Sequence, residues 1–242
     1  MGILPIDPAF LDGMRQDWDA RARENAKHYV ATSHKNWDDN EFFRSGAEEV
    51  RELVEKPCAD ICKGRSPADM RILEIGCGAG RMTLALSRVF GRVDAVDISP
   101  EMIAQARVAL AARTNVYLYV NNGADLSMFS DDTFDFAISA IVFQHIPKQA
   151  IVENYIKETW RVLRPESLFK FQLQGCPIAE KHANTWVGVG FNEKQMQNIA
   201  ARSGFEITQS SGAGTQYYWL TFEKRNSCKE PQNHKINFRS MR

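Results

Sequence analysis

A glycine-rich stretch at residues 71–83, RILEIGCGAGRMT, constrains the fold more than any other part of this sequence. Residues 71–75 have the composition of a short buried strand, the glycines that follow form a turn, and a helix begins after them. This order directs bare backbone N–H groups at a ligand. Asp97 stands at the end of the next strand, where a carboxylate can accept both hydroxyls of a ribose. The combination predicts a nucleoside cofactor.

The spacing of the glycines separates two classes of nucleoside cofactor. A dinucleotide fingerprint, G-x-G-x-x-G, needs a small third residue for close packing of helix and strand. Counting from Gly76, that position is Arg81, a long cation, so the fingerprint fails. The run from Glu74 instead resembles the first motif of the class I S-adenosylmethionine (SAM)-dependent methyltransferases, [E/D]-x-G-x-G-x-G. The resemblance implies SAM as the cofactor and S-adenosylhomocysteine as its product.

Four further segments are similar to motifs of that family at similar spacing. They are the ribose segment VDAVDISPEM (93–102), the adenine loop and next strand NNGADLSMFSDDTFDFAIS (121–139), the methyl-end motif AIVFQHIP (140–147), and the fifth-strand segment RVLRPESLFKFQ (161–172). The last motif is usually written L-[KR]-P-G-G, and Glu166-Ser167 replaces the two glycines here. The resemblance covers residues 70–173 well, residues 190–223 weakly and the N-terminal region hardly at all.

The order of predicted elements indicates an α/β fold. Short strands are expected at 71–75, 93–96, 116–120, 134–139, 168–173, 205–209 and 216–223. Helices are expected over 8–29, 37–55 and 81–90, and from Pro100, Pro147 and Asn192. Ser99 and Asn192 serve as N-caps, Pro165 stops the helix from Pro147, and Gly204 ends the last helix. We therefore expect a doubly wound, mostly parallel seven-stranded sheet of the Rossmann-like methyltransferase kind.

The chain divides into three predicted parts. Residues 1–65 form a helical cap or lid, residues 66–223 form the SAM-binding domain, and residues 224–242 form a basic, flexible tail. From Lys224 onward six basic residues stand against the single acid Glu230. A long loop at residues 174–191 contains glycines and Trp186 and has the character of a mobile lid.

The resemblance carries cofactor roles onto particular residues. Glu74 orients the glycine turn and the methionine ammonium, Asp97 binds the ribose, and Asp125 contacts the adenine amino group. Each acid also has a purely structural interpretation: Asp97 as the cap of a turn, Glu74 as a buried acid bonded to nearby backbone, and Asp125 as a solvated loop acid. The full expected set is Glu74, Gly76, Cys77, Gly78, Gly80, Arg81, Asp97, Ile98, Met102, Asp125, Leu126 and Ser139.

His145 is the candidate for proton chemistry. Histidine titrates near neutrality and can take a proton from a hydroxyl or amine nucleophile. The alternative is a structural histidine bonded to a backbone carbonyl. Acceptor contacts are expected from Gln144, Trp186, Trp18 and Tyr29, and ordinary packing also accounts for these aromatic rings.

The composition of the chain limits which partners we expect it to bind. The 30 basic and 30 acidic residues balance to zero net charge, which argues against a nucleic acid held through its phosphates. The five cysteines have no metal-ligand spacing, so we expect no metal and a reducing, cytoplasmic setting. Neither a membrane span nor a secretory leader is expected.

The sequence thus predicts methyl transfer by S_N2 displacement to an oxygen or nitrogen of a small molecule. A protein or RNA methyltransferase is an alternative that only the basic tail supports. A SAM-binding regulatory protein without catalysis would keep Glu74, Gly78 and Asp97. An NAD-dependent oxidoreductase is disfavoured by Arg81. The acceptor, the pathway and the oligomeric state stay open.

Overall fold

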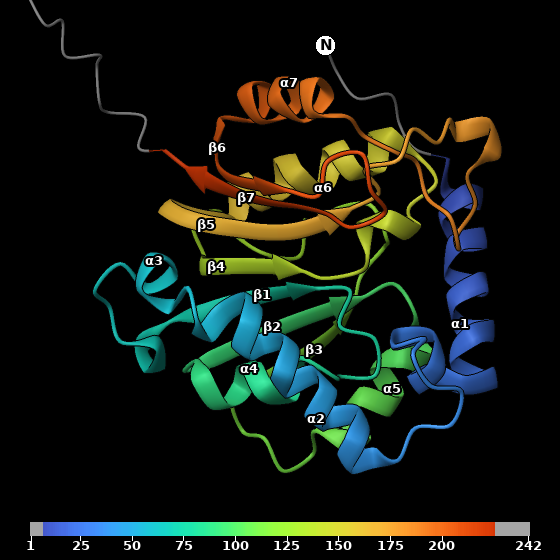
Figure 1. The fold of residues 1–242 in the computed structure, drawn as a ribbon. Helices are drawn as coiled ribbons and strands as arrows, with labels where there is room; N and C mark the ends of the chain where they lie inside the picture. The colour runs from blue at the N-terminus through green and yellow to red at the C-terminus, as the bar shows by residue number, and fades with distance from the viewer. Residues whose placement is uncertain (1–6, 226–242) are drawn as a thin grey trace, which may run out of the picture.

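A seven-stranded sheet runs through the computed structural model, which describes residues 7–225 (Figure 1). The strands are β1 (Arg71–Ile75), β2 (Arg92–Asp97), β3 (Val116–Val120), β4 (Phe134–Ser139), β5 (Leu163–Leu173), β6 (Phe205–Ser211) and β7 (Tyr218–Lys224). The α-helices are α1 (Pro8–Val30), α2 (Asp39–Val50), α3 (Cys58–Cys62), α4 (Thr83–Val89), α5 (Pro100–Ala109), α6 (Gln149–Val162) and α7 (Glu193–Ser203). A π-helical turn (Arg51–Glu55) and short 3-10 helices, among them Phe143–His145, complete the regular structure.

The strand order is β3-β2-β1-β4-β5-β7-β6, with β1 to β5 parallel and β7 antiparallel to both of its neighbours. The chain moves outward from β1 to β3 and then returns to place β4 on the other side of β1. This reversal is a topological switch point, beside which ligands bind at the carboxyl ends of the strands. The prediction of a doubly wound, mostly parallel seven-stranded sheet is confirmed.

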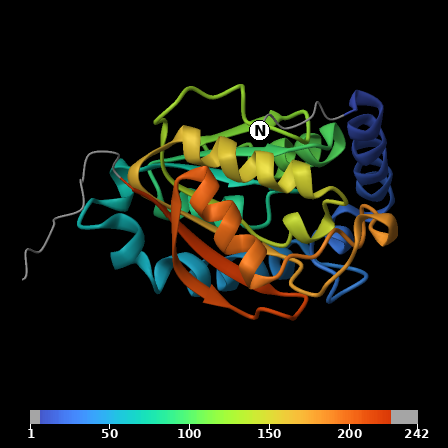
Figure 2. The ribbon, with the colours of Figure 1, turned by 90° about the horizontal axis from the view of Figure 1, so that it is seen from above.

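Apolar side chains cover both faces of the sheet. One cluster includes Phe134, Phe143 and Phe171 and packs under α6 and α7, which lie next to each other in the view from above (Figure 2). The other cluster includes Ile72 and Phe136 and packs under α2 and α4. Burial on both faces explains why the central strands are nearly continuous apolar runs.

Most predicted boundaries agree with the structure. The Ser99 side chain accepts a hydrogen bond from the Met102 N–H, and Pro100 begins α5. Asn192 and Gln195 form a capping box at the start of α7, and Gly204 ends that helix at a φ of 82°. These signals are local, so the sequence is sufficient to locate them.

Two proline assignments are wrong. Pro147 does not open a helix, because α6 begins at Gln149 after the cap residue Lys148. Pro165 does not stop that helix either, since α6 ends at Val162 and β5 starts directly at Leu163, five residues earlier than expected. The pairing of β4 with β5 is irregular here, because Phe134 pairs with Leu163 and Phe136 pairs with Leu168. Pro165 lies in this irregular part of β5, where a residue without an N–H is tolerated.

The helical N-terminal region packs against the sheet domain. In α1, Asp19 accepts hydrogen bonds from the Ser99 hydroxyl and the Glu101 N–H at the start of α5. The helix is interrupted at Asn25, whose amide group donates to the Lys35 carbonyl. As a result α1 lies along the edge of the sheet where the parallel strands end (Figure 1).

The C-terminal boundary differs from the prediction by one residue. Lys224 belongs to β7, is buried, and donates to Asp132 and to the Leu163 carbonyl. The rest of the predicted basic tail, apart from Arg225, lies outside the described residues. The division into a cap, a SAM-binding domain and a tail stays a prediction.

Two helical glycines are expected to respond in opposite directions to alanine. A Cβ on Gly46 in α2 would overlap the backbone carbonyl of Arg81, so Gly46→Ala should lower the free energy of unfolding by about 1–3 kcal/mol. Gly13 in α1 has open space around its Cα, so Gly13→Ala should be stabilising by about 0.5–1 kcal/mol. Urea denaturation of both variants tests this. A stabilised Gly46→Ala protein would contradict the close approach of α2.

Candidate cofactor and acceptor site

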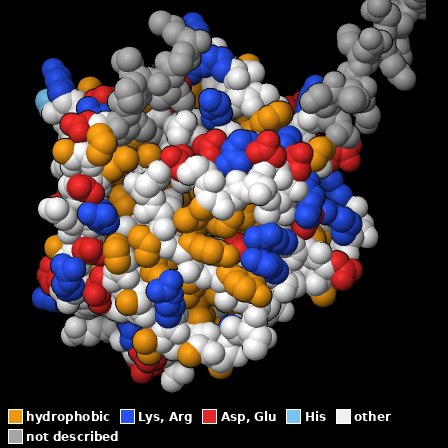
Figure 3. Space-filling model, turned by 180° about the vertical axis from the view of Figure 1, so that it is seen from behind, with side chains coloured by type: hydrophobic (Ala, Val, Ile, Leu, Met, Phe, Trp, Pro, Cys, Tyr) orange, Lys and Arg blue, Asp and Glu red, His pale blue; other side chains and the backbone are white. Residues whose placement is uncertain are grey.

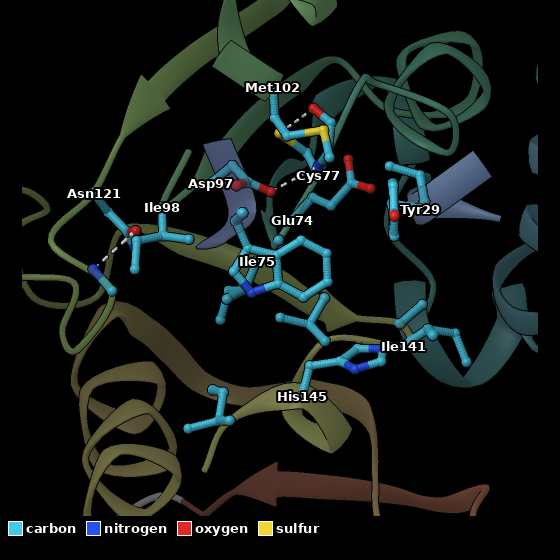
Figure 4. A pocket seen from close by; sticks show the side chains of 18 of the residues that line it. Tyr29, Glu74, Ile75, Cys77, Asp97, Ile98, Met102, Asn121, Ile141 and His145 are labelled. Atoms are coloured by element: carbon cyan, nitrogen blue, oxygen red, sulfur yellow. Dashed lines mark hydrogen bonds between the residues drawn. The ribbon is translucent and has the colours of Figure 1, made fainter. Parts of the chain in front are cut away.

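A cavity of about 890 Å³, part of it open to solvent, lies at the carboxyl ends of β1, β2 and β4. Glu74 and Asp97 lie on one side of it, with His145 and Ile141 across from them and Tyr29 at the edge (Figure 4). Eleven of the residues predicted for the site line it: Glu74, Gly76, Cys77, Gly78, Arg81, Asp97, Ile98, Met102, His145, Trp18 and Tyr29. Residues that the sequence did not single out, including Met14, Val30, Asn121, Ile141, Val142 and Tyr155, complete the wall.

Asp97 joins the glycine turn to the start of α5. One carboxylate oxygen accepts from the Gly78 N–H at 2.8 Å, and the other accepts from the Ser99 N–H at 2.9 Å. Burial raises the pKa of Asp97 to about 6, against the lowering effect of these two N–H groups. A carboxylate has about four lone-pair sites, so Asp97 retains capacity for the hydroxyls of a ribose.

The turn itself requires glycine. Gly76, Gly78 and Gly80 all have positive φ angles, of 78°, 52° and 85°. A Cβ on Gly76 would overlap Val142, and one on Gly78 would meet Val30 of α1. The turn therefore allows both neighbouring segments to approach closely.

Glu74 is a buried acid in the same wall. Its carboxylate accepts a hydrogen bond of 2.6 Å from the Thr83 hydroxyl. Burial raises the pKa of Glu74 to about 7, although Thr83 and the charge of Arg81 favour the ionised form. Arg81 itself pairs with Glu49 of α2. A cationic group entering the cavity would stabilise the ionised Glu74.

Four predicted cofactor residues are not among the residues that line this cavity. The Asp125 carboxylate accepts hydrogen bonds from Asn122 and Ser127 within its own loop. Leu126 is part of the core, and the Ser139 hydroxyl donates to the Ile75 carbonyl. Gly80 lies within the turn, against Leu110. Their direct contacts with a cofactor stay predictions.

His145 is held at both ring nitrogens. Nδ1 lies 2.7 Å from the Trp186 carbonyl, and because a carbonyl only accepts, Nδ1 carries the proton. Nε2 lies 3.1 Å from the side-chain nitrogen of Gln144 and accepts from it. Burial lowers the pKa of His145 to about 4, so the ring is neutral near pH 7.

A second cavity, of about 1370 Å³ and partly open to solvent, adjoins the first. Both cavities are lined by Tyr29, Val30, Arg81, Ile141 and His145, so the two spaces meet there. The second cavity is further lined by Trp37, Gln144, Gln174, Trp186, Gln216 and Tyr217, among others. The predicted acceptor residues Gln144 and Trp186 are thus found in this second space, whereas Trp18 faces the first and Tyr29 faces both.

A contact between α1 and the loop after β5 closes one side of the site. The Arg21 guanidinium lies 4.7 Å from the centre of the Trp18 ring and 5.5 Å from that of Trp186. It also donates to the Thr185 hydroxyl, which in turn donates to Asp17. Arg21 and Thr185 are 164 residues apart, so no local sequence signal identifies the pair.

Residues 7–225 contain neither a cluster of metal-ligating side chains nor a helix able to span a membrane. No group of three or more His, Cys, Asp or Glu side chains between residues 7 and 225 could hold a metal ion. No helix in the same range has the length and apolar character needed to cross a membrane.

Comparisons with known proteins agree with this geometry. The family described as "Methyltransferase domain" matches residues 72–166. The ubiquinone biosynthesis O-methyltransferase of Xanthomonas oryzae pv. oryzae is 29% identical over 114 residues, which are 46% of each chain. The chain thus spans about half the length of the curated relatives it matches.

Solved structures extend the fold similarity over most of the chain. Magnesium protoporphyrin IX methyltransferase from Synechocystis PCC 6803, crystallised with SAM, gives a TM-score of 0.62 at 17% identity, covering 92% of this chain and 99% of that one. The [4+2]-cyclase SpnF gives 0.64 at 16% identity, covering 87% and 95%. At these identities the similarity concerns the fold alone.

The sheet order and the cavity at the switch point define a Rossmann-like nucleoside-binding protein. Residues 72–166 match a methyltransferase domain, so the chain contains a domain of the class I SAM-dependent methyltransferase kind, whose cofactor is SAM. The residues present fit that cofactor. A buried carboxylate at Glu74 suits a cationic end, Asp97 suits a ribose, and Ile98 and Met102 offer an apolar wall for a ring.

The raised pKa of Glu74 predicts that the stability difference between the wild type and a Glu74→Gln variant, both free of cofactor, depends on pH. Between its ordinary value of 4.5 and about 7, the folded state holds a proton that the unfolded state releases, so this group's contribution to stability falls as pH rises through that window. Glu74→Gln should therefore raise the melting temperature more at pH 7.5 than at pH 5.

Melting curves of wild type and variant at both pH values test this, because the comparison cancels other titrating groups. Glu48→Gln, an exposed change on α2, is the control and should give the same small shift at both. A shift for Glu74→Gln that does not depend on pH would contradict the burial of an ionisable carboxyl.

Proposed function

We propose that this protein transfers the methyl group of SAM to an oxygen or nitrogen of a small molecule bound in the second cavity. The observation that carries the proposal is the shared wall, where residues of both cavities meet beside His145 and Ile141. A cofactor whose ribose lies at Asp97 and whose ammonium lies at Glu74 would direct its remaining substituents toward this junction.

SAM supplies an activated methyl group, which leaves the sulfonium as the acceptor forms its new bond and the C–S electron pair stays on sulfur. Any proton on the acceptor is released to solvent or to a base. The chain's own residues then need chiefly to orient and enclose the reactants. Such positioning can account for about 7–11 kcal/mol of a barrier. Exclusion of water by α1 and the loop after β5 would strengthen the electrostatics inside.

The lining of the second cavity favours an uncharged aromatic acceptor. The rings of Trp37, Trp186 and Tyr29 offer flat apolar surfaces, while Gln174 and Gln216 offer amide groups. Among the described residues lining this cavity, the charged side chains Arg81 and Glu49 pair with each other, which leaves little to attract a free anion. The similarity to ubiquinone biosynthesis O-methyltransferases supports oxygen as the accepting atom.

A nucleic-acid acceptor is less well supported. The charges balance over the whole chain, and on the face seen in Figure 3 basic and acidic side chains are interspersed. Phosphate backbones are bound by clustered positive charge. A small molecule remains the better candidate.

Calorimetry should show that SAM and S-adenosylhomocysteine bind and that NAD does not. Asp97→Ala removes a charged acceptor of hydrogen bonds and should weaken SAM binding by about 10- to 100-fold. Asp12→Ala, an exposed change on α1, is the control and should bind like wild type. If Asp97→Ala bound SAM with wild-type affinity, the ribose assignment would be wrong.

Methyl transfer is tested by the release of S-adenosylhomocysteine in the presence of hydroxylated aromatic compounds. Neutral phenols and hydroxyquinones should be methylated faster than analogues bearing a carboxylate or phosphate. Trp186→Ala should raise the acceptor KM by about tenfold or more while leaving SAM affinity within about twofold. Binding of SAM with no product from any class of acceptor would favour the non-catalytic alternative.

A further inference from the structure

A chain of hydrogen bonds links the sheet to the loop over the acceptor cavity. It begins at Gln172 in β5, whose amide nitrogen donates to the Gln216 carbonyl at 2.8 Å and to the Gln144 side-chain oxygen at 2.9 Å. The Gln144 amide nitrogen donates to His145 Nε2, and His145 Nδ1 donates to the Trp186 carbonyl. Gln172 and Gln144 are almost fully buried, so the chain is anchored in rigid structure.

This arrangement fixes the proton on one ring nitrogen. The Gln144 oxygen is committed to Gln172, so the amide nitrogen is the group that faces His145. An amide N–H donates, and Nε2 must therefore present its lone pair to Gln144. The lone pair that a general base would use is occupied, and the proton at Nδ1 is already given to a carbonyl.

The partner of Nδ1 belongs to the loop that covers the second cavity. Next to Trp186, the Gly188 N–H donates to the Gln144 carbonyl at 2.7 Å, and the Val189 N–H donates to the Ile146 carbonyl at 3.0 Å. The His145 ring also packs against Trp186 and Trp18, each with its ring centre 5.4 Å away. The side chain thus joins the 3-10 helix, the loop and α1 at one point.

We propose that His145 is a positioning residue whose Nδ1–H holds the Trp186 carbonyl and so keeps residues 184–189 closed over the acceptor cavity, with Gln144 and Gln172 setting the tautomer. The inference deepens the function proposed above and rests on it. It replaces the base predicted from the sequence with a contact that acts through Trp186, a residue lining the acceptor cavity.

Two substitutions separate the positioning role from proton transfer. Asparagine can place its amide nitrogen close to the position of Nδ1 and keep the donor to Trp186. Glutamine extends its amide toward the position of Nε2 and loses that donor. Neither amide can act as a base near pH 7. A positioning role therefore predicts rescue by His145→Asn and loss in His145→Gln, whereas a base predicts loss in both.

Hydrogen–deuterium exchange of the ligand-free protein gives a readout independent of any acceptor. The amides of Gly188 and Val189 should exchange at the wild-type rate in His145→Asn and about tenfold faster or more in His145→Gln. Gln144→Leu should give faster exchange as well, because it frees the ring to change tautomer. Imidazole ¹⁵N NMR of the wild type should show a protonated Nδ1 and an unprotonated Nε2.

Kinetics with a phenol found to be methylated complete the test. The KM of the phenol should rise about tenfold in His145→Gln and return to within about threefold of wild type in His145→Asn. Equal loss of kcat in both variants, with exchange unchanged, would overturn the proposal in favour of a base. Wild-type exchange in His145→Gln or a protonated Nε2 would also overturn it.

SAM calorimetry on the same proteins distinguishes a failure of the proposed function from a failure of the role proposed for His145. If the wild type failed to bind SAM, the proposed function would fall. Exchange at Gly188 and Val189 would still report whether His145 closes the loop.

Discussion

The hydrogen bond from the Gly78 N–H to the Asp97 carboxylate connects the parts on which the site depends. It joins the turn after β1 to the end of β2, while the second oxygen of Asp97 fixes the start of α5 through Ser99. The turn can come this close only because its glycines adopt positive φ angles. Around this one carboxylate, two strands and two helix starts are arranged into one wall of the cavity.

That wall contains two acids that are costly to bury. Glu74 and Asp97 both have pKa values raised by burial, which means that their ionised forms are unfavourable in the cofactor-free protein. A cation and a ribose would stabilise those charges on binding. The two buried acids therefore lower the stability of the folded protein and raise its affinity for the cofactor, a balance common at functional sites.

The opposite wall depends on segments distant in the sequence. α1 is fixed to the start of α5 through Asp19, and it meets the loop after β5 through Arg21 and Thr185. His145 joins the same loop from the sheet side. The second cavity lies where these segments meet, so its shape depends on contacts that only the folded chain makes.

The sequence alone was sufficient to predict the strands and helices of the sheet domain, because their signals are local. These signals are short apolar runs, glycines that permit positive φ angles, and cap residues such as Ser99 and Asn192. It misplaced the roles of Pro147 and Pro165. For Pro165 the reason is that β5 pairs with β4 from Leu163 onward, and local sequence does not show that pairing. The sequence locates the loop of Asp125 and Leu126, and the contacts of these two residues with a cofactor stay predictions.

The sequence by itself determined the glycine turn after β1 and the acid at the end of β2, and so predicted a nucleoside site there, because these signals lie within a few residues of each other. Only the tertiary structure decided which residues face the acceptor and which ring nitrogen of His145 bears its proton. The proton position depends on the Trp186 carbonyl, 41 residues from His145, and the cavity is lined by residues as far apart in the sequence as Tyr29 and Gln216. Contacts at such separations leave no periodic trace in a sequence.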